Sequence, residues 1–151
     1  MSSRVDIGIL LNVAFGVFKR DLHRHLAECG FNDLGSSFGY VFRLLDREPH
    51  NLHGVAVALG ITAQGALKIV NDMVEKRYVE RRDDPDDGRV KWLELTHRAK
   101  DAMAQARRFH DLYERGLTQR FGEAQVSALR AVLKDIYATA LVEGFADIRP
   151  L

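Results

Sequence analysis

Histidines are the residues of this sequence most able to bind a metal ion or transfer protons, and there are six of them. His23 and His25 lie two residues apart, so on a helix their side chains point about 200° apart and cannot share a metal ion. We expect His97 and His110 to lack a carboxylate or cysteine at ligand spacing. No nucleophile motif, P-loop or dinucleotide fingerprint occurs. The sequence therefore predicts no metal site, no cofactor and no enzyme activity.

Cys29 is the single cysteine, which excludes an intramolecular disulfide and any multi-cysteine metal site. One thiol could still sense oxidants or bridge two subunits. Glu28 beside it disfavours the thiolate, because a negative neighbour repels the ionised form. We expect a small, buried, apolar side chain, and thiol-based redox sensing through Cys29 stays an alternative.

A different chemistry, contact with nucleic acid, is suggested by basic residues around a predicted turn. Residues 84–88 read Asp-Pro-Asp-Asp-Gly, in which proline presets φ and glycine accepts a positive φ. The flanking segments 78–82 and 90–95 are rich in β-formers, so the pattern predicts a β-hairpin. An arginine at such a tip can enter a minor groove, where the negative potential attracts it. Basic residues along the hairpin could add phosphate contacts, and these are Arg81, Arg82 and Lys91.

The overall charge neither supports nor excludes a nucleic-acid partner. The formal net charge is +1, and residues 1–60, 61–100 and 101–151 carry six and six, nine and eight, and seven and seven basic and acidic side chains. No segment is strongly basic, so the case depends on the arrangement of elements rather than on composition.

The elements that would position these residues are mostly helices, because apolar residues recur at three- and four-residue steps. We expect helices over about 7–26, from Ser36 or Ser37 to before Pro49, over 52–59, from a Thr62 cap to about 76, from Thr96 to about 121, and over 123–145. The hairpin falls between the fourth and fifth helices. This order predicts a mainly α fold with a small β-hairpin wing (α+β), a winged helix-turn-helix flanked by dimerisation helices.

The same order predicts three regions. Residues 1–30 form an N-terminal helix of the dimerisation region, residues 31–96 the winged helix-turn-helix, and residues 97–151 the C-terminal dimerisation helices. A short helix, a glycine turn, a capped helix and a hairpin suit DNA, because a helix fits the major groove and its N-terminal residues meet the base edges.

Two motifs resemble the MarR (multiple antibiotic resistance regulator) family. Residues 52–62, Leu-His-Gly-Val-Ala-Val-Ala-Leu-Gly-Ile-Thr, are similar to the family's second and third elements. Asp87-Gly88-Arg89, followed after five residues by Leu95-Thr96, is similar to its wing motif in type and spacing. The resemblance covers nearly the whole chain, because the family also has helices for dimerisation at both ends.

This resemblance implies the DNA-binding residues. The helix that begins at Thr62 corresponds to the recognition helix and Arg89 to the wing arginine, with Asp87 as its orienting partner. Gln64 would contact adenine, and Lys68, where the family often has arginine, a phosphate. The implied set is Thr62, Ala63, Gln64, Gly65, Lys68, Arg81, Arg82, Asp87, Arg89 and Lys91. The sequence departs from the family at Gly65 and Leu67, where Thr or Ser is common, and at Arg77, which replaces a helix-terminating glycine.

The resemblance also implies the partners: double-stranded DNA with a pseudo-palindromic operator, a second copy of the chain, and a small aromatic or anionic effector. Such a protein would be a ligand-responsive repressor in the cytoplasm, with no membrane contact. The dimer seam would include Phe109, Leu112, Leu117, Phe121 and the stripe from Val126 to Leu141. The candidate effector pocket comprises Phe15, Phe38, Tyr40, Phe42, Phe109 and Tyr113. A winged helix that has become a protein-interaction module is the remaining alternative.

Overall fold

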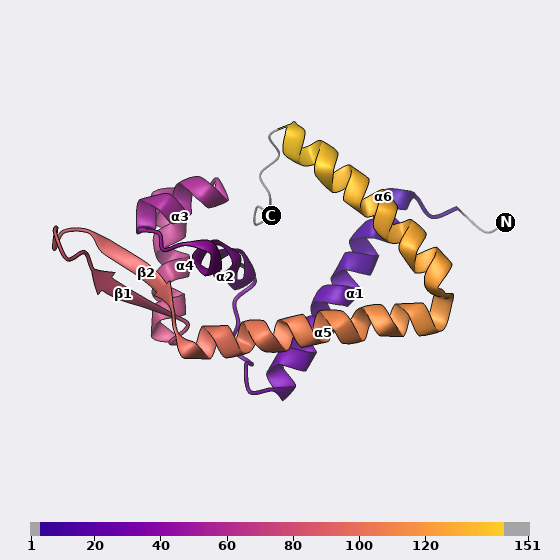
Figure 1. The fold of residues 1–151 in the computed structure, drawn as a ribbon, viewed down its shortest axis with the longest axis horizontal. Helices are drawn as coiled ribbons and strands as arrows, with labels where there is room; N and C mark the ends of the chain where they lie inside the picture. The colour runs from indigo at the N-terminus through magenta and orange to yellow at the C-terminus, as the bar shows by residue number, and fades with distance from the viewer. Residues whose placement is uncertain (1–3, 144–151) are drawn as a thin grey trace.

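The elements follow one another in the expected order in the computed structural model, which describes residues 4–143. Within these residues the chain forms six helices and one two-stranded antiparallel sheet (Figure 1). The predicted fold class, mainly α with a hairpin wing, is confirmed. The elements are α1 (Ile7–Glu28), α2 (Phe38–Arg47), α3 (Leu52–Leu59), α4 (Ala63–Glu75), β1 (Val79–Asp83), β2 (Lys91–Leu95), α5 (His97–Phe121) and α6 (Glu123–Val142). The predicted extension of the last helix to residue 145 lies outside the described residues.

The hydrophobic core belongs to the winged-helix unit. Helices α2, α3 and α4, both strands and the first turns of α5 each contribute buried side chains to one cluster. Tyr78, Met73 and Val70 are completely buried at its centre. The rings of Phe38, Phe42 and Tyr78 pack edge to face, with centroids 5.7–6.3 Å apart. The core thus fixes α4 and the hairpin, which carry the predicted DNA contacts.

Three helix starts in residues 4–143 carry a side-chain cap, and the cap expected at α2 is absent. The side chains of Asn51, Thr62 and Thr96 accept hydrogen bonds from Gly54, Gly65 and Ala99 at the starts of α3, α4 and α5. Ser37 precedes α2, but neither Ser37 nor Ser36 caps it, because Ser37 already has helical backbone angles and makes no side-chain cap bond. The expected serine cap was therefore wrong, although the start of the helix was right.

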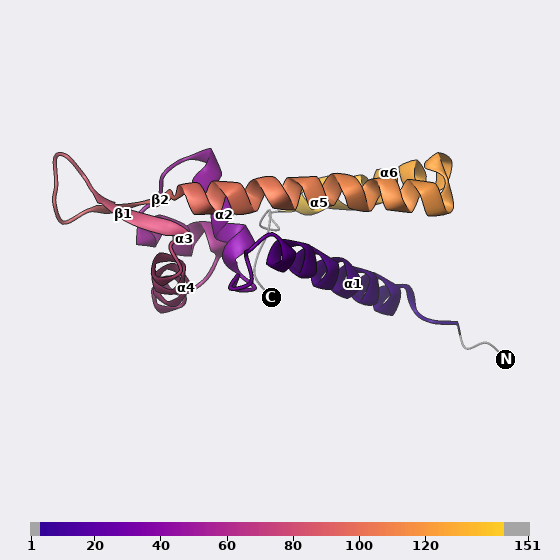
Figure 2. The same cartoon turned by 90° about the horizontal axis from the view of Figure 1, so that it is seen from below.

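The hairpin projects from one end of the molecule (Figure 2). Its register pairs Val79 with Leu95 and Asp83 with Lys91. His50 adds one bridge to Leu93, which ties the segment before α3 to the sheet. This arrangement places residues 84–90 at the far tip of the wing.

Helices α1, α5 and α6 extend away from the winged-helix unit (Figure 1). α5 leads out of β2, α1 crosses it, and α6 turns back from its far end at Gly122, whose φ is 87°. In α1 only Leu26 is buried, and in α6 no residue is buried. These two helices therefore present most of their apolar side chains to the surface of the single chain.

Within residues 4–143, no single helix is both long and apolar enough to cross a membrane. Helices α3 and α4 meet the length and composition test only as a pair, with a bend of 114° between them. Their apolar side chains include Val55, Ala66 and Val70, which are completely buried in the protein core.

Candidate nucleic-acid interface

A tight turn joins α3 to α4 and sets the direction of α4. Gly60 ends α3 with a φ of 64°, a left-handed conformation that glycine adopts without steric cost. The N–H of Ile61 then donates to the carbonyl of Ala56 at 3.0 Å. One residue later the Oγ1 of Thr62 accepts from the N–H of Gly65 at 3.0 Å. The turn and the cap together place the first turn of α4 at the surface.

α4 separates its residues into a buried and an exposed face. Ala66, Val70 and Met73 are completely buried, whereas Ala63, Gln64 and Lys68 are exposed. Among residues 4–143, Lys68 makes no ion pair or side-chain hydrogen bond, so its ammonium group is open to a ligand. The predicted recognition residues therefore lie on the accessible face.

Gly65 has a structural role beside its predicted DNA contact. A Cβ at this position would lie 3.1 Å from the Oγ1 of Thr62, closer than most Cβ contacts. A larger residue would push against the cap that starts the helix.

Asp84 organises the tip of the wing. Its Oδ1 accepts from the backbone N–H groups of Asp86 at 2.8 Å and Asp87 at 3.1 Å. Its Oδ2 accepts from the indole N–H of Trp92 at 2.7 Å. These hydrogen bonds, first that of Trp92 and then those of the backbone, lower the pKa of Asp84. A charged Asp84 thus closes the loop onto β2.

Asp87 in turn holds Arg89. The Oδ1 of Asp87 accepts from the backbone N–H of Arg89 at 3.0 Å and from its Nε at 3.3 Å. The Arg89 side chain is nevertheless 93% exposed. The predicted pairing of Asp87 with Arg89 is present, and it leaves the end of the guanidinium free.

The other basic residues of the hairpin are engaged by neighbours. Arg82 pairs with Glu94 at 3.1 Å and Glu80 at 3.6 Å, and Lys91 pairs with Asp83. Arg81 donates to the side-chain oxygen of Asn71 on α4, so the hairpin lies alongside the exposed face of that helix. Residues 79–95 hold six acidic and four basic side chains, a net charge of −2. The sequence predicted phosphate contacts for Arg81, Arg82 and Lys91 beside Arg89, whereas the fold leaves Arg89 the most open of the four.

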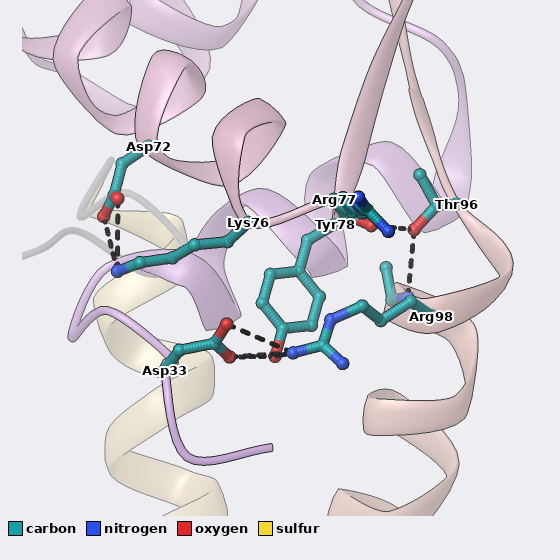
Figure 3. Close-up of polar contacts among 8 residues, drawn as sticks. Asp33, Asp72, Lys76, Arg77, Tyr78, Thr96 and Arg98 are labelled. Carbon is teal, nitrogen blue, oxygen red and sulfur yellow. Dashed lines mark hydrogen bonds and ion pairs between the residues drawn. The ribbon is translucent and has the colours of Figure 1, made fainter. Parts of the chain in front are cut away.

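A polar cluster that sequence reasoning missed joins the wing to α5 (Figure 3). The hydroxyl of Tyr78 donates to Asp33 at 2.5 Å, and Arg98 donates to both carboxylate oxygens of Asp33 at 3.0 and 3.1 Å. The Arg98 guanidinium also lies 4.6 Å from the centre of the Tyr78 ring. No local signal marks this cluster, because Asp33 is 45 residues from Tyr78 and 65 from Arg98.

The cluster shifts the ionisation of its members in opposite directions. Burial raises the pKa of Asp33, but the Tyr78 hydrogen bond and the positive charge of Arg98 outweigh burial and leave it below its usual value. Burial, the hydrogen bond to Asp33 and its negative charge raise the pKa of Tyr78 to about 12. At neutral pH the cluster therefore holds a carboxylate, a phenol and a guanidinium.

The structure does not bring the six predicted effector-pocket residues together. Phe38 and Phe42 are buried in the winged-helix core, and Tyr40 packs partly against it. Phe109 and Tyr113 pack instead against Phe18 of α1, with ring centroids 5.6 and 5.0 Å from it. Phe15 is 51% exposed beside Lys19. The aromatic residues thus fill two packed clusters, with Phe15 outside both.

Cys29 and His97 differ from expectation. The Cys29 thiol is exposed rather than buried, and it lies 3.8 Å from the His25 Nε2 and 3.5 Å from the side-chain oxygen of Gln105. The Nε2 of His97 lies 3.6 Å from Asp101, four residues later, so the prediction that His97 lacks a carboxylate at ligand spacing was wrong. The side chains of His97 and Asp101 are both exposed. In residues 4–143, no three His, Cys, Asp or Glu residues are grouped so that they could hold a metal ion.

The buried three-helix core, the glycine turn before α4 and the adjoining hairpin define a winged helix-turn-helix protein. Residues 37–90 match the model of the MarR family. The resemblance drawn from residues 52–62 and from Asp87 and Arg89 is therefore confirmed, because both motifs lie in the segment that matches this family's model.

Solved structures share the fold over most of the chain. RV1404 from Mycobacterium tuberculosis has a TM-score of 0.71 at 18% identity, covering 90% of this chain and 95% of that one. A mutant MarR from E.coli complexed with operator DNA has a TM-score of 0.63 at 20% identity, covering 86% and 92%. A mutant MepR from S. aureus bound to an oligodeoxyribonucleotide has a TM-score of 0.61 at 18% identity, covering 90% and 99%. No curated protein sequence matches the chain.

Proposed function

We propose that this protein is a homodimeric transcriptional regulator that binds double-stranded DNA through α4 and the tip of the wing. One observation carries the proposal: two exposed cations, Lys68 on α4 and Arg89 at the wing tip, lie on neighbouring elements. The two solved relatives that hold operator DNA and an oligodeoxyribonucleotide support the choice of ligand.

We infer a different groove for each of the two elements. α4 has the dimensions to enter a major groove, where Gln64 can form a bidentate pair with adenine. Lys68, one turn later, would contact a phosphate as a point charge. The wing reaches along the duplex to the adjacent minor groove, where the exposed end of Arg89 enters the region of negative potential.

The ion pairs of the hairpin set the expected salt dependence. Arg82 and Lys91 already have carboxylate partners and would have to exchange them for phosphates. Lys68 and Arg89 of each protomer would neutralise phosphate charge, so a dimer would displace about four counterions. The expected slope of log K against log salt concentration is then roughly −3.6. Engagement of Arg81, Arg82 and Lys91 in both protomers would make the slope much steeper.

The apolar surface of α1 and α6 supports the proposed dimerisation. The exposed large hydrophobic residues of these helices are Ile7, Ile9, Leu10, Leu11, Val13, Phe15, Val17, Leu129, Val132, Leu133, Ile136, Tyr137, Leu141 and Val142. Such a surface on a single chain marks an interface. A second copy would cover it and set two α4 helices in successive major grooves of a pseudo-palindrome. Leu112 and Phe121 of α5 are also exposed and would extend the seam, whereas Phe109 is buried within the chain.

The direction of regulation and its control are part of the same proposal. A dimer bound across a promoter would repress by blocking it. A small aromatic or anionic effector bound between the dimer helices and the winged unit would change the spacing of the two α4 helices and so the affinity for DNA. A thermal-shift panel of aromatic acids tests this part, and an unchanged midpoint with every acid would contradict it.

The decisive experiment measures fluorescence anisotropy of the protein on duplexes selected from a random pool, at two salt concentrations. Arg89→Ala should weaken binding strongly and lower the salt slope. Arg82→Ala is the matched control, because this arginine lies on the same hairpin but is paired with Glu94. Equal, small effects of both variants would contradict the assignment of Arg89.

A protein-interaction module is the second candidate, and the net charge of −2 on residues 79–95 favours it. Such a surface repels phosphates outside the reach of Arg89. A folded dimer that shows only weak binding, indifferent to sequence and to Arg89→Ala, would replace the DNA-binding proposal with this one.

A further inference from the structure

Leu67 is a large apolar residue on the accessible side of α4, where it is 41% exposed. The exposed large hydrophobic residues of the described chain lie on α1, α5, α6 and at Val5, apart from two in the winged-helix unit: Val57 on α3 and Leu67 on α4. Leu67 is therefore not part of the apolar surface that a second copy would cover.

The position of Leu67 places its side chain in the first two turns of α4. It follows Ala63 by four residues, so the two side chains share one side of the helix, and Ala63 is also exposed. Helical side chains lean toward the N-terminus, which brings the isobutyl group of Leu67 back over Ala63. Gln64 lies about 60° from Leu67 around the helix axis. An apolar strip of Ala63 and Leu67 thus runs beside the polar groups of Gln64 and Lys68.

The neighbours of Leu67 leave this strip open. Gly65 has no side chain, and Asn71, one turn beyond Leu67, is held by Arg81 of the wing. No bulky apolar side chain in the first turn of α4 therefore covers the strip, and a ligand that contacts Gln64 can also contact Leu67.

The major groove presents one apolar group, the C5-methyl of thymine, and apolar side chains contact it there. We propose that Leu67 is a specificity-determining residue that contacts a thymine methyl group in each half-site, beside the adenine bound by Gln64. This inference rests on the proposed DNA-binding function and names a base that the function alone does not specify. It predicts an A·T-containing step under the first two turns of α4.

The test uses the full-length protein and a duplex selected from the random pool. Each thymine of a half-site is replaced in turn, symmetrically in both halves, by deoxyuridine, which lacks only the methyl group. For the wild type, one position per half-site should lower the affinity by about fourfold per methyl, or about fifteenfold for the symmetric pair. Leu67→Ala should bind the thymine and the deoxyuridine duplexes within about 1.5-fold of each other.

Val57→Ala is the matched control, since Val57 is the other exposed hydrophobic residue of the unit and lies on α3. This variant should retain the full wild-type response to deoxyuridine. Both variants should remain folded, because both side chains are exposed. Unchanged circular dichroism verifies this.

Two outcomes would overturn the inference while leaving the proposed function intact: tight, Arg89-dependent binding that no deoxyuridine substitution weakens, or a response that Leu67→Ala retains in full. Absence of sequence-specific binding by the wild type would overturn both the inference and the proposed function. A response lost only in Leu67→Ala would establish the contact.

Discussion

The hydroxyl of Tyr78 donates a 2.5 Å hydrogen bond to the Oδ1 of Asp33, a residue 45 positions earlier in the chain (Figure 3). Asp33 lies in the loop between α1 and α2, and Tyr78 directly precedes the wing. Arg98 of α5 binds both residues. This cluster therefore joins the winged-helix unit to the helix that leads to the proposed dimer seam.

Removing the Tyr78 hydroxyl should destabilise the fold. Tyr78→Phe deletes one hydrogen bond to a carboxylate while Arg98 still neutralises Asp33, so the free energy of unfolding should fall by about 1–2 kcal/mol. Urea denaturation followed by circular dichroism measures the change. Tyr113→Phe is the control, because that ring packs against Phe18 and Phe109 away from this cluster. A loss no larger in Tyr78→Phe than in the control would contradict the role of the cluster.

The same cluster predicts a dependence of stability on alkaline pH. Because folding raises the pKa of Tyr78 to about 12, its contribution is complete below the unfolded value near 10 and is lost as pH rises toward 12. The stability difference between the wild type and Tyr78→Phe should therefore shrink over this window. Asp33 has a lowered pKa, so its contribution is complete above about 4 and is lost as pH falls further. A difference that stays constant from pH 9 to 12 would argue against the hydrogen bond.

Asp84 and Trp92 should control the position of the wing tip. Asp84→Ala removes the acceptor of the Trp92 indole N–H and of two backbone N–H groups, so the loop that presents Arg89 loses its closure. We expect weaker DNA binding than in the wild type, but a smaller loss than in Arg89→Ala. Trp92 is the only tryptophan, so its fluorescence reports the release directly. Asp87→Ala serves as a comparison: it frees Arg89 without releasing the indole, and should leave the emission unchanged.

Arg77 should be a site where glycine stabilises the protein. Its φ of 64° makes it the one non-glycine residue of positive φ among residues 4–143, at the C-terminal end of α4. Arg77→Gly should raise the free energy of unfolding by roughly 0.5–1 kcal/mol, because relief of left-handed strain exceeds the entropy lost on folding. Arg77→Ala keeps the Cβ and the strain, so it separates backbone relief from loss of charge. An equal gain in both variants would refute the explanation by strain.

Thr62 should stabilise the protein through one hydrogen bond at the start of α4. Thr62→Ala removes the acceptor for the N–H of Gly65 and should cost about 1 kcal/mol in the free energy of unfolding. Thr62→Ser retains the oxygen and should restore most of the loss. Thermal denaturation of the three proteins checks this order, and a serine variant as unstable as the alanine variant would contradict it.

Local chemistry determined most of the fold from the sequence. Apolar periodicity located the helices, Thr62 and Thr96 located two helix starts, and the Asp-Pro-Asp-Asp-Gly segment located the wing. These signals act between residues a few positions apart, so they can be recognised in a single amino-acid sequence. Ser37 shows the limit of such reasoning, because its backbone is already helical and its side chain cannot cap α2.

Tertiary structure alone decided which of the candidate residues are available. The sequence singled out Arg89 and added Arg81, Arg82 and Lys91 as further phosphate contacts. Strand register sets Lys91 opposite Asp83 and places Glu94 diagonally across from Arg82, while Arg89 stays open at the turn. The same register and packing produce the Asp33, Tyr78 and Arg98 cluster and divide the predicted pocket aromatics. Pairing and burial depend on contacts between distant segments, and these arise only when the chain has folded.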